Sequence, residues 1–157
     1  MKPVSQLQIR EDDLTGKEIA DFLREHLEDM HEITPPESVH ALDLEGLRSP
    51  NITFWSAWEG AELVGCGALK ELDARSGEVK SMRTARVHRG RGVGSKILER
   101  IIEEAKLRAY DCLNLETGAM PEFSRARAFY IRYGFEHRGP FADYVDDPNS
   151  VFMTKKL

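Results

Sequence analysis

Residues 86–106 read RVHRGRGVGSKILERIIEEAK, and this stretch decides the fold. Three glycines stand at alternate positions, 90, 92 and 94, beside several arginines. Apolar residues then recur at the spacing of one helical face: Ile97, Leu98, Ile101, Ile102 and Ala105. The stretch therefore predicts a glycine-rich loop that opens a helix running from Gly94 to about Tyr110.

The glycine-rich loop is suited to holding an anion. The first N–H groups of a helix lack backbone partners and carry partial positive charge, and glycine lets that backbone come close to a ligand. Arg89 and Arg91 add positive charge at the rim. We favour a phosphate ligand over a loop that merely turns the chain. The dinucleotide motif G-x-G-x-x-G is excluded because Ser95 takes its last place, and no Walker A Gly-Lys-Ser/Thr follows.

Composition bounds the rest of the chain. Its 157 residues, 41% hydrophobic and 31% charged, predict one domain over residues 1–157. The formal net charge of -5 argues against a general binder of nucleic acid or of membrane surfaces. The first residues lack the apolar core of a signal peptide, and no apolar run is long enough to span a bilayer, so we expect a cytoplasmic protein. Cys66 and Cys112 lie apart in apolar runs, which predicts neither a disulfide nor a metal site.

The hydrophobic periodicity predicts an alternation of strands and helices. Helices are expected over residues 15–32, 35–47, 94–110 and 122–134, the first with a capping box of Thr15 and Glu18 and the last ended by Gly134. Strands are expected over residues 6–10, 51–58, 61–72, 77–87, 111–117, 134–139 and 150–157. This order indicates an α/β sandwich built on a mixed sheet.

Two motifs resemble those of the GNAT superfamily of acetyl-coenzyme-A-dependent N-acyltransferases. Arg89, Gly92 and Gly94 match the signature Gln/Arg-x-x-Gly-x-Gly/Ala, placed after a strand and opening a helix. Downstream, ARAFYIRYGF at residues 126–135 resembles the later motif, in which a helix carries an aromatic–Tyr pair and ends in Gly-Phe. The stretches GEVKSMRT, LETG and FADYVDDPNSVFM further resemble a bacterial subgroup of unassigned substrate. The resemblance implies a mixed, mostly antiparallel sheet of roughly six to seven strands, about four flanking helices and a splayed central strand pair.

The same resemblance implies acetyl-coenzyme A as co-substrate, and we expect no metal. The pantetheine arm would lie between the strands at about residues 79–87 and 112–117, paired with their open edges. The diphosphate would lie on the backbone amides of about residues 90–95. The residues expected to bind this co-substrate are Met82, Thr84, Val87, Arg89, Gly90, Arg91, Gly92, Val93, Gly94, Ser95 and Phe129.

Two side chains are candidates for the chemistry. The resemblance places the hydroxyl of Tyr130 beside the sulfur of the co-substrate, where a phenol can give the departing thiolate its proton; a tyrosine that only packs in the core is the alternative. Glu78 lies eleven residues before Arg89, the offset of the general base in histone-acetylating members. A solvated glutamate, with a water chain as base, would fit the same position. A backbone N–H near Met82 or Arg83 is expected to stabilise the oxyanion.

The acceptor site is the part that the sequence defines least. The resemblance points to the first two helices and the final loop, which makes His40, Asp143 and Tyr144 the candidate acceptor-binding residues. Acids in a Pro/Asn loop are also typical of a solvated turn, and for the acidic run we favour that reading. We expect acetyl transfer to a primary amine of a small metabolite. Protein lysines or N-termini as acceptors, a non-catalytic acyl-coenzyme A sensor and, least favoured, an RNA-binding module are the alternatives. A longer acyl donor and a homodimer stay open.

Overall fold

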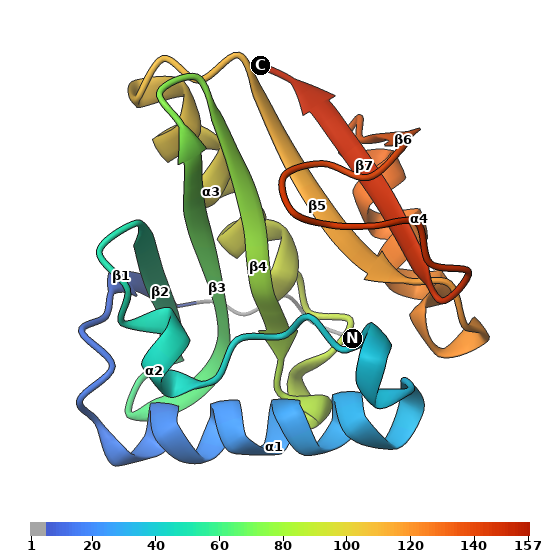
Figure 1. Ribbon diagram of the computed structural model, residues 1–157. Helices are drawn as coiled ribbons and strands as arrows, with labels where there is room; N and C mark the ends of the chain where they lie inside the picture. Colours follow the sequence, from blue (N-terminus) through green and yellow to red (C-terminus); the bar gives the residue numbers. More distant parts are fainter. Residues whose placement is uncertain (1–5) are drawn as a thin grey trace.

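A seven-stranded sheet forms the centre of the computed structural model, which describes residues 6–157 (Figure 1). In spatial order the strands are β1 (Leu7–Glu11), β2 (Ile52–Glu59), β3 (Glu62–Asp73), β4 (Ser76–Thr84), β5 (Cys112–Gly118), β7 (Ser150–Lys156) and β6 (Glu136–Arg138). Every neighbouring pair is antiparallel except β4 and β5, which run parallel. The predicted mixed, mostly antiparallel sheet is confirmed.

Helices cover both faces of this sheet. α1 (Lys17–Ile33) and the single-turn α2 (Leu44–Leu47) pack on one face, and α3 (Val93–Leu107) and α4 (Ser124–Arg132) on the other (Figure 1). Because alternate strand residues point to opposite faces, two apolar cores form. The core beneath α1 consists of Leu14, Ile19, Phe22, Leu23, Leu47, Phe54, Cys66 and Ala68. The larger core beneath α3 and α4 includes Ile97, Leu98, Ile101, Leu113, Leu115, Phe135 and Met153.

The parallel strands β4 and β5 separate after a short pairing. Their register joins only residues 76–78 of β4 with residues 112–114 of β5. Beyond Glu78 and Asn114 the two ribbons diverge, as Figure 1 shows, and within the described chain neither strand has another partner on that side. The predicted splayed pair is therefore confirmed, and it leaves two backbone edges facing a gap.

A β-bulge interrupts β4 just beyond the point of separation. The register with β3 shifts there, so that Ser81 and Met82 together oppose Gly67 alone. Ser81 adopts a left-handed φ of 56°. A bulge turns neighbouring backbone groups away from the regular ladder. It lies in the segment where the sequence predicts an N–H group for the oxyanion.

Two predicted helix features are wrong. Thr15 and Glu18 form no capping box: α1 begins after Gly16 without a side-chain cap, and the Thr15 hydroxyl instead donates to Asp13 Oδ1 at 2.6 Å. Residues 35–47 do not form one helix but a 3-10 turn at Pro36–Ser38 and the separate α2. Asp43 explains the second start, because its Oδ1 accepts from the Gly46 N–H at 2.9 Å and caps α2.

The end of β4 also differs from the prediction. β4 ends at Thr84 rather than at residue 87, and residues 86–88 form a 3-10 turn that leads into the glycine loop. Val87 therefore lies outside the strand, with 73% of its surface exposed.

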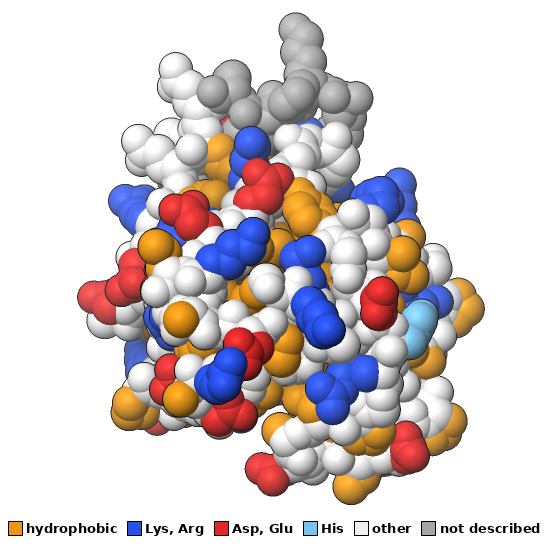
Figure 2. Space-filling model, turned by 90° about the horizontal axis from the view of Figure 1, so that it is seen from above, with side chains coloured by type: hydrophobic (Ala, Val, Ile, Leu, Met, Phe, Trp, Pro, Cys, Tyr) orange, Lys and Arg blue, Asp and Glu red, His pale blue; other side chains and the backbone are white. Residues whose placement is uncertain are grey.

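The end of the molecule opposite α1 has a mixed charge. Figure 2 shows Lys and Arg side chains interspersed with Asp and Glu across this end. Such a surface offers no extended basic patch for a polyanion on the face that Figure 2 shows. Within residues 6–157, no helix combines the length and the apolar character that crossing a membrane requires.

Candidate active site

The glycine loop presents open backbone at the start of α3. Gly90 and Gly92 adopt positive φ angles of 78° and 84°, which suit glycine, and Gly92 is the N-cap of α3. No side chain in the described part of the chain caps this helix. A Cβ added to Gly92 would meet nothing within 4 Å. The start of α3 therefore has open space at Gly92 and no side-chain cap at the place where the sequence predicts an anion.

The side chains around the loop divide into anchors and exposed groups. Arg91 donates to Glu59 Oε2 at 3.0 Å and lies 2.6 Å from His88 Nδ1, while His88 Nε2 lies 2.7 Å from Glu62 Oε2. These contacts fasten the loop to the β2–β3 hairpin. Arg91, predicted at the phosphate, thus extends its guanidinium toward the hairpin, whereas Arg89 is exposed.

Three elements converge at the first turn of α3. A Cβ on Gly94 would lie 3.6 Å from Thr84 Oγ1 at the end of β4 and 3.8 Å from the Phe129 ring of α4. Val93, predicted at the co-substrate, is 1% exposed and packs in the core beneath α3, and Ser95 is half-buried in the same turn. The structure therefore brings Thr84, Gly94 and Phe129 together, as predicted for one binding site.

A cavity of about 150 Å³ lies where β4 and β5 separate. It is walled by β4, β5, α4, the C-terminal half of α1 and the segment 34–41. Four predicted residues line it: Met82, Tyr130, Glu78 and His40. Residues that were not predicted also line it, among them His26, Met30, Lys80, Glu116 and Phe123. The cavity continues the gap between β4 and β5 toward α1 and residues 34–41, the region where the resemblance implies the acceptor.

Tyr130 lines this cavity with a neutral side chain. Its ring is 8% exposed and is held by Phe129 and Phe135, with ring centroids 5.3 and 5.6 Å away. Burial raises the pKa of Tyr130 above its ordinary value of 10.0. Among the described residues, its hydroxyl has no hydrogen-bonding partner. The hydroxyl is therefore a protonated donor that can serve a ligand.

Glu78 lies in a buried polar cluster. The side chain is 2% exposed, so the alternative of a solvated glutamate is wrong. Its Oε2 accepts from Lys80 Nζ at 3.2 Å and from the Tyr144 hydroxyl at 2.5 Å. Lys80 Nζ also donates to the Tyr144 hydroxyl at 3.0 Å and to the His40 carbonyl at 3.5 Å. Lys80, which the sequence analysis missed, thus joins three of the predicted residues.

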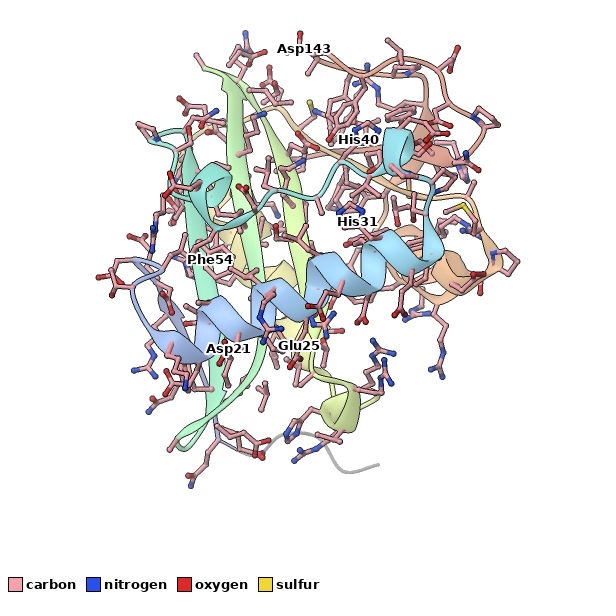
Figure 3. The ribbon with its side chains drawn as sticks, turned by 60° about the horizontal axis from the view of Figure 1, so that its bottom comes forward. Asp21, Glu25, His31, His40, Phe54 and Asp143 are labelled. Carbon is pink, nitrogen blue, oxygen red and sulfur yellow. The ribbon has the colours of Figure 1, made fainter. Side chains whose placement is uncertain are left out.

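The acceptor-side candidates are placed differently from one another. The His40 ring packs edge-on against Tyr144, with centroids 5.0 Å apart, and burial lowers the pKa of His40 below 6.5. Asp143 is exposed at the periphery of the molecule, as Figure 3 shows, and does not line the cavity. Of the three, His40 lines the cavity. Tyr144 does not line it but contacts the lining residues His40 and Glu78, and Asp143 does neither.

The acidic loop before β7 is more than a solvated turn. Asp143 and Asp146 are exposed, as that reading predicts. Asp147, however, accepts from the Ser38 hydroxyl at 2.5 Å, and Asn149 Nδ2 donates to Ser38 Oγ at 3.4 Å. The loop is thereby fastened to the 3-10 turn at Pro36–Ser38, whose Ser38 lines the cavity.

Glu116 of β5 is a second carboxyl group in the cavity, and the sequence analysis missed it. Burial raises its pKa from 4.5 to about 7; the carboxylates of Glu78 and Asp147 act in the same direction, and Ser150 and Lys80 oppose them. The LETG stretch contained a signal for a carboxyl group at the site. Asn114 and Glu116 are two residues apart and therefore point to the same face of β5, and Asn114 pairs with Glu78. The sequence alone does not show which strand lies beside Glu116.

The chain is similar to known proteins over most of its length. The family model described as an acetyltransferase (GNAT) domain matches residues 50–137. The chain is 59% identical over 151 residues to the uncharacterized N-acetyltransferase YsnE of Bacillus subtilis, covering 96% of this chain and 100% of that protein. It is 41% identical over 128 residues to the IAA acetyltransferase of Azospirillum brasilense, covering 80% and 82% of the two chains.

Solved structures show the same architecture. A Klebsiella pneumoniae structure assigned as an acyl-CoA N-acyltransferase superposes with a TM-score of 0.78 at 30% identity, covering 97% of this chain and 98% of that one. The PaiA N-acetyltransferase of Thermoplasma acidophilum, solved in complex with coenzyme A, superposes with a TM-score of 0.74 at 16% identity, covering 97% and 99%. The second similarity concerns the fold.

Proposed function

Because the chain belongs to the GNAT family of N-acetyltransferases, we propose that it moves an acetyl group from acetyl-coenzyme A to a primary amine of a small metabolite. The observation that carries this proposal is the cavity between β4 and β5, which is lined by a neutral phenol and two carboxyl groups. The start of α3, which has no side-chain cap, adds a place for an anion. Each of these meets one need of acyl transfer to an amine.

The residues present fit acetyl-coenzyme A. Gly92 leaves the start of α3 open, so that its amides can hold the diphosphate. The unpaired edges of β4 and β5 can bind the amides of the pantetheine arm as an added strand would. When bound, acetyl-coenzyme A supplies the activated thioester. The bulge at Ser81 and Met82 carries backbone N–H groups at the cavity wall, which suits stabilisation of the carbonyl oxygen.

Tyr130 is the proposed acid. Its hydroxyl gives a proton to the leaving sulfur, and its raised pKa keeps that proton in place until it is needed. The acceptor reacts as a neutral amine, so its ammonium form must first lose a proton to a group in the cavity. Glu78 and Glu116 are the two carboxyl groups available among the lining residues.

A small acceptor is supported by the closed side of the cavity. The segment from α2 back to the 3-10 turn at Pro36–Ser38 crosses β3 and β4 (Figure 1), and residues 38–41 line the cavity. Ser38 and Asp147 join this segment to the loop before β7. A wall across this side favours a compact amine over an extended peptide.

The test is a screen of acceptors with acetyl-coenzyme A, in which release of the coenzyme A thiol is measured. The panel contains primary amines, a lysine peptide, a peptide with a free N-terminus and IAA, the compound named in the Azospirillum brasilense relative. We expect a small amine to give the highest kcat/KM. A preference for either peptide would overturn the acceptor class, and thiol release that no acceptor accelerates would overturn the transferase function.

A further inference from the structure

We propose that Glu116 is the catalytic base that takes the proton from the acceptor ammonium, and that Glu78 is a positioning residue. This inference rests on the proposed acetyl transfer. Both carboxyl groups line the cavity, Glu78 from β4 and Glu116 from β5. They differ in what already binds them.

Glu78 is committed to partners inside the protein. One oxygen, Oε2, receives both the Lys80 ammonium and the Tyr144 hydroxyl. The side chains of Glu78 and Lys80 are 2% and 8% exposed. Protonating Glu78 would leave the Lys80 cation buried without its counter-ion, which is costly. The contacts of Glu78 instead indicate a structural role, because they hold the loop that carries Tyr144 against the sheet.

Glu116 lies where the gap has opened. The last residue pair between the parallel strands is Glu78 with Asn114, and Glu116 follows two residues later on the same face of β5. On the other side of β5 it stands opposite Phe152, which is 5% exposed. No ion pair to Glu116 is formed within residues 6–157. Its carboxyl group therefore lies at the cavity without an ion pair of its own, because Lys80, the cation that lowers its pKa, is paired with Glu78.

The groups around Glu116 give it a pKa that suits a catalytic base. Lys80 and Glu78 face it from β4, Asp147 and Tyr144 from the loop before β7, and Ser150 from β7 itself. Burial is the largest influence and raises the pKa of Glu116 to about 7. A base whose pKa lies near the working pH is present as carboxylate and still accepts a proton readily.

The proton balance closes with two groups. Glu116 receives one proton from R–NH3⁺ and releases it to solvent. As the nitrogen–carbonyl bond forms and the carbon–sulfur bond breaks, Tyr130 gives its hydroxyl proton to sulfur and is restored by the proton that nitrogen loses. The sum is R–NH3⁺ plus thioester giving amide, thiol and one H⁺.

The experiment compares the pH dependence of kcat/KM in four variants, with acetyl-coenzyme A and the panel amine of highest turnover. Glu116→Gln should lower kcat about 10²-fold or more and remove the rise in activity near pH 7, while the KM for acetyl-coenzyme A stays constant. Glu116→Asp should retain the rise because it keeps a carboxyl group. Glu78→Gln should also retain it, and Glu103→Gln on the exposed face of α3 is the matched control.

A rise near pH 7 that survives in Glu116→Gln would overturn the inference, and its loss in Glu78→Gln alone would assign the base to Glu78. A second readout needs no acceptor: carbon-13 NMR of glutamate carboxyl groups should show one group titrating near pH 7 that is missing from Glu116→Gln. If every glutamate titrates in its ordinary range, the inference fails. A wild-type protein that turns over no amine would instead refute the proposed function.

Discussion

At the scale of single residues, Tyr130 is the most direct test of the chemistry. Tyr130→Phe removes the hydroxyl and keeps the ring that packs against Phe129 and Phe135. We expect turnover to fall by about 10–10² while acetyl-coenzyme A affinity, measured by titration calorimetry, is unchanged. The matched control is Tyr133→Phe, which loses the hydroxyl that interacts with Glu99 and Ser95 outside the cavity. Equal turnover in the two variants would show that the acid lies elsewhere.

Glu116 should also affect stability in a pH-dependent way. The pKa of its carboxyl group is raised to about 7 in the folded chain, against an ordinary 4.5, so the folded state holds more protons between these pH values. Its contribution to stability is therefore present below about pH 4.5 and is lost as pH rises through 7. Glu116→Gln keeps the neutral form, so its free energy of unfolding should exceed that of the wild type by about 1–3 kcal/mol at pH 8 and match it near pH 4.5. Urea unfolding at both pH values measures the difference, and an equal difference at both would contradict the assignment.

The sequence predicts site residues well where a motif covers them and poorly where a long-range contact places them. Tyr130 and the glycines lie in motifs; Tyr130 lines the cavity, and Gly94 lies beside Phe129 of the same helix. Lys80 and Glu116 lie in the stretches GEVKSMRT and LETG, which resemble a subgroup but assign no role to either residue, because their roles depend on which strands face each other. Asp143 shows the opposite error: it was predicted at the acceptor site, and although its loop contacts that site, Asp143 itself is exposed.

At the scale of elements, the start of α3 decides binding of the donor. Gly92→Asp places a negative side chain where the diphosphate is proposed to lie, and also strains a residue with φ of 84°. We expect acetyl-coenzyme A affinity to fall by at least about tenfold in calorimetry, the loss of roughly one favourable interaction with an anion. Gly60→Asp separates charge from strain, because Gly60 has a φ of 60° and equally open space in the β2–β3 turn. Both variants should lose about 1 kcal/mol of stability, but only the first should lose affinity.

Long elements follow from hydrophobic periodicity, and short ones do not. α1, α3 and the strands lie near their predicted bounds, because each buries one regularly spaced face. Residues 35–47 break into two separate turns, because the cap at Asp43 and the contacts of Ser38 with the distant loop outweigh local helix propensity. Such contacts join residues about a hundred positions apart and leave no local pattern.

At the scale of the whole molecule, the buried pair of Glu78 and Lys80 links the sheet to the acceptor-side loop. Glu78→Gln or Lys80→Met alone should lower the free energy of unfolding by about 3–5 kcal/mol, because each leaves one polar partner unmatched in a buried site. The double variant should lose less than the sum of the two. The exposed pair of Arg24 and Glu28 is the control, and Glu28→Gln should change stability by less than about 0.5 kcal/mol. Additive losses in the double variant would show that the two charges act independently.

The order of the elements together with two motifs was enough to predict the architecture, including the splayed strands. The position of the bulge, the wall made by residues 38–41 and the second carboxyl group all arise from packing between distant segments. These are the features that define the acceptor side, and they explain why the donor was easier to predict than the acceptor.

The three residue pairs between β4 and β5 have a consequence for motion. Because this pairing is so short, β4 and β5 can open locally along the middle of the sheet. A donor that binds both strand edges acts as an additional strand and prevents this opening. Deuterium uptake by the amides of residues 79–84 and 115–118 should therefore slow when acetyl-coenzyme A is present, while the fully paired β2–β3 hairpin keeps its rate. Donor binding and completion of the sheet are then one event, and the empty protein is the looser of two states.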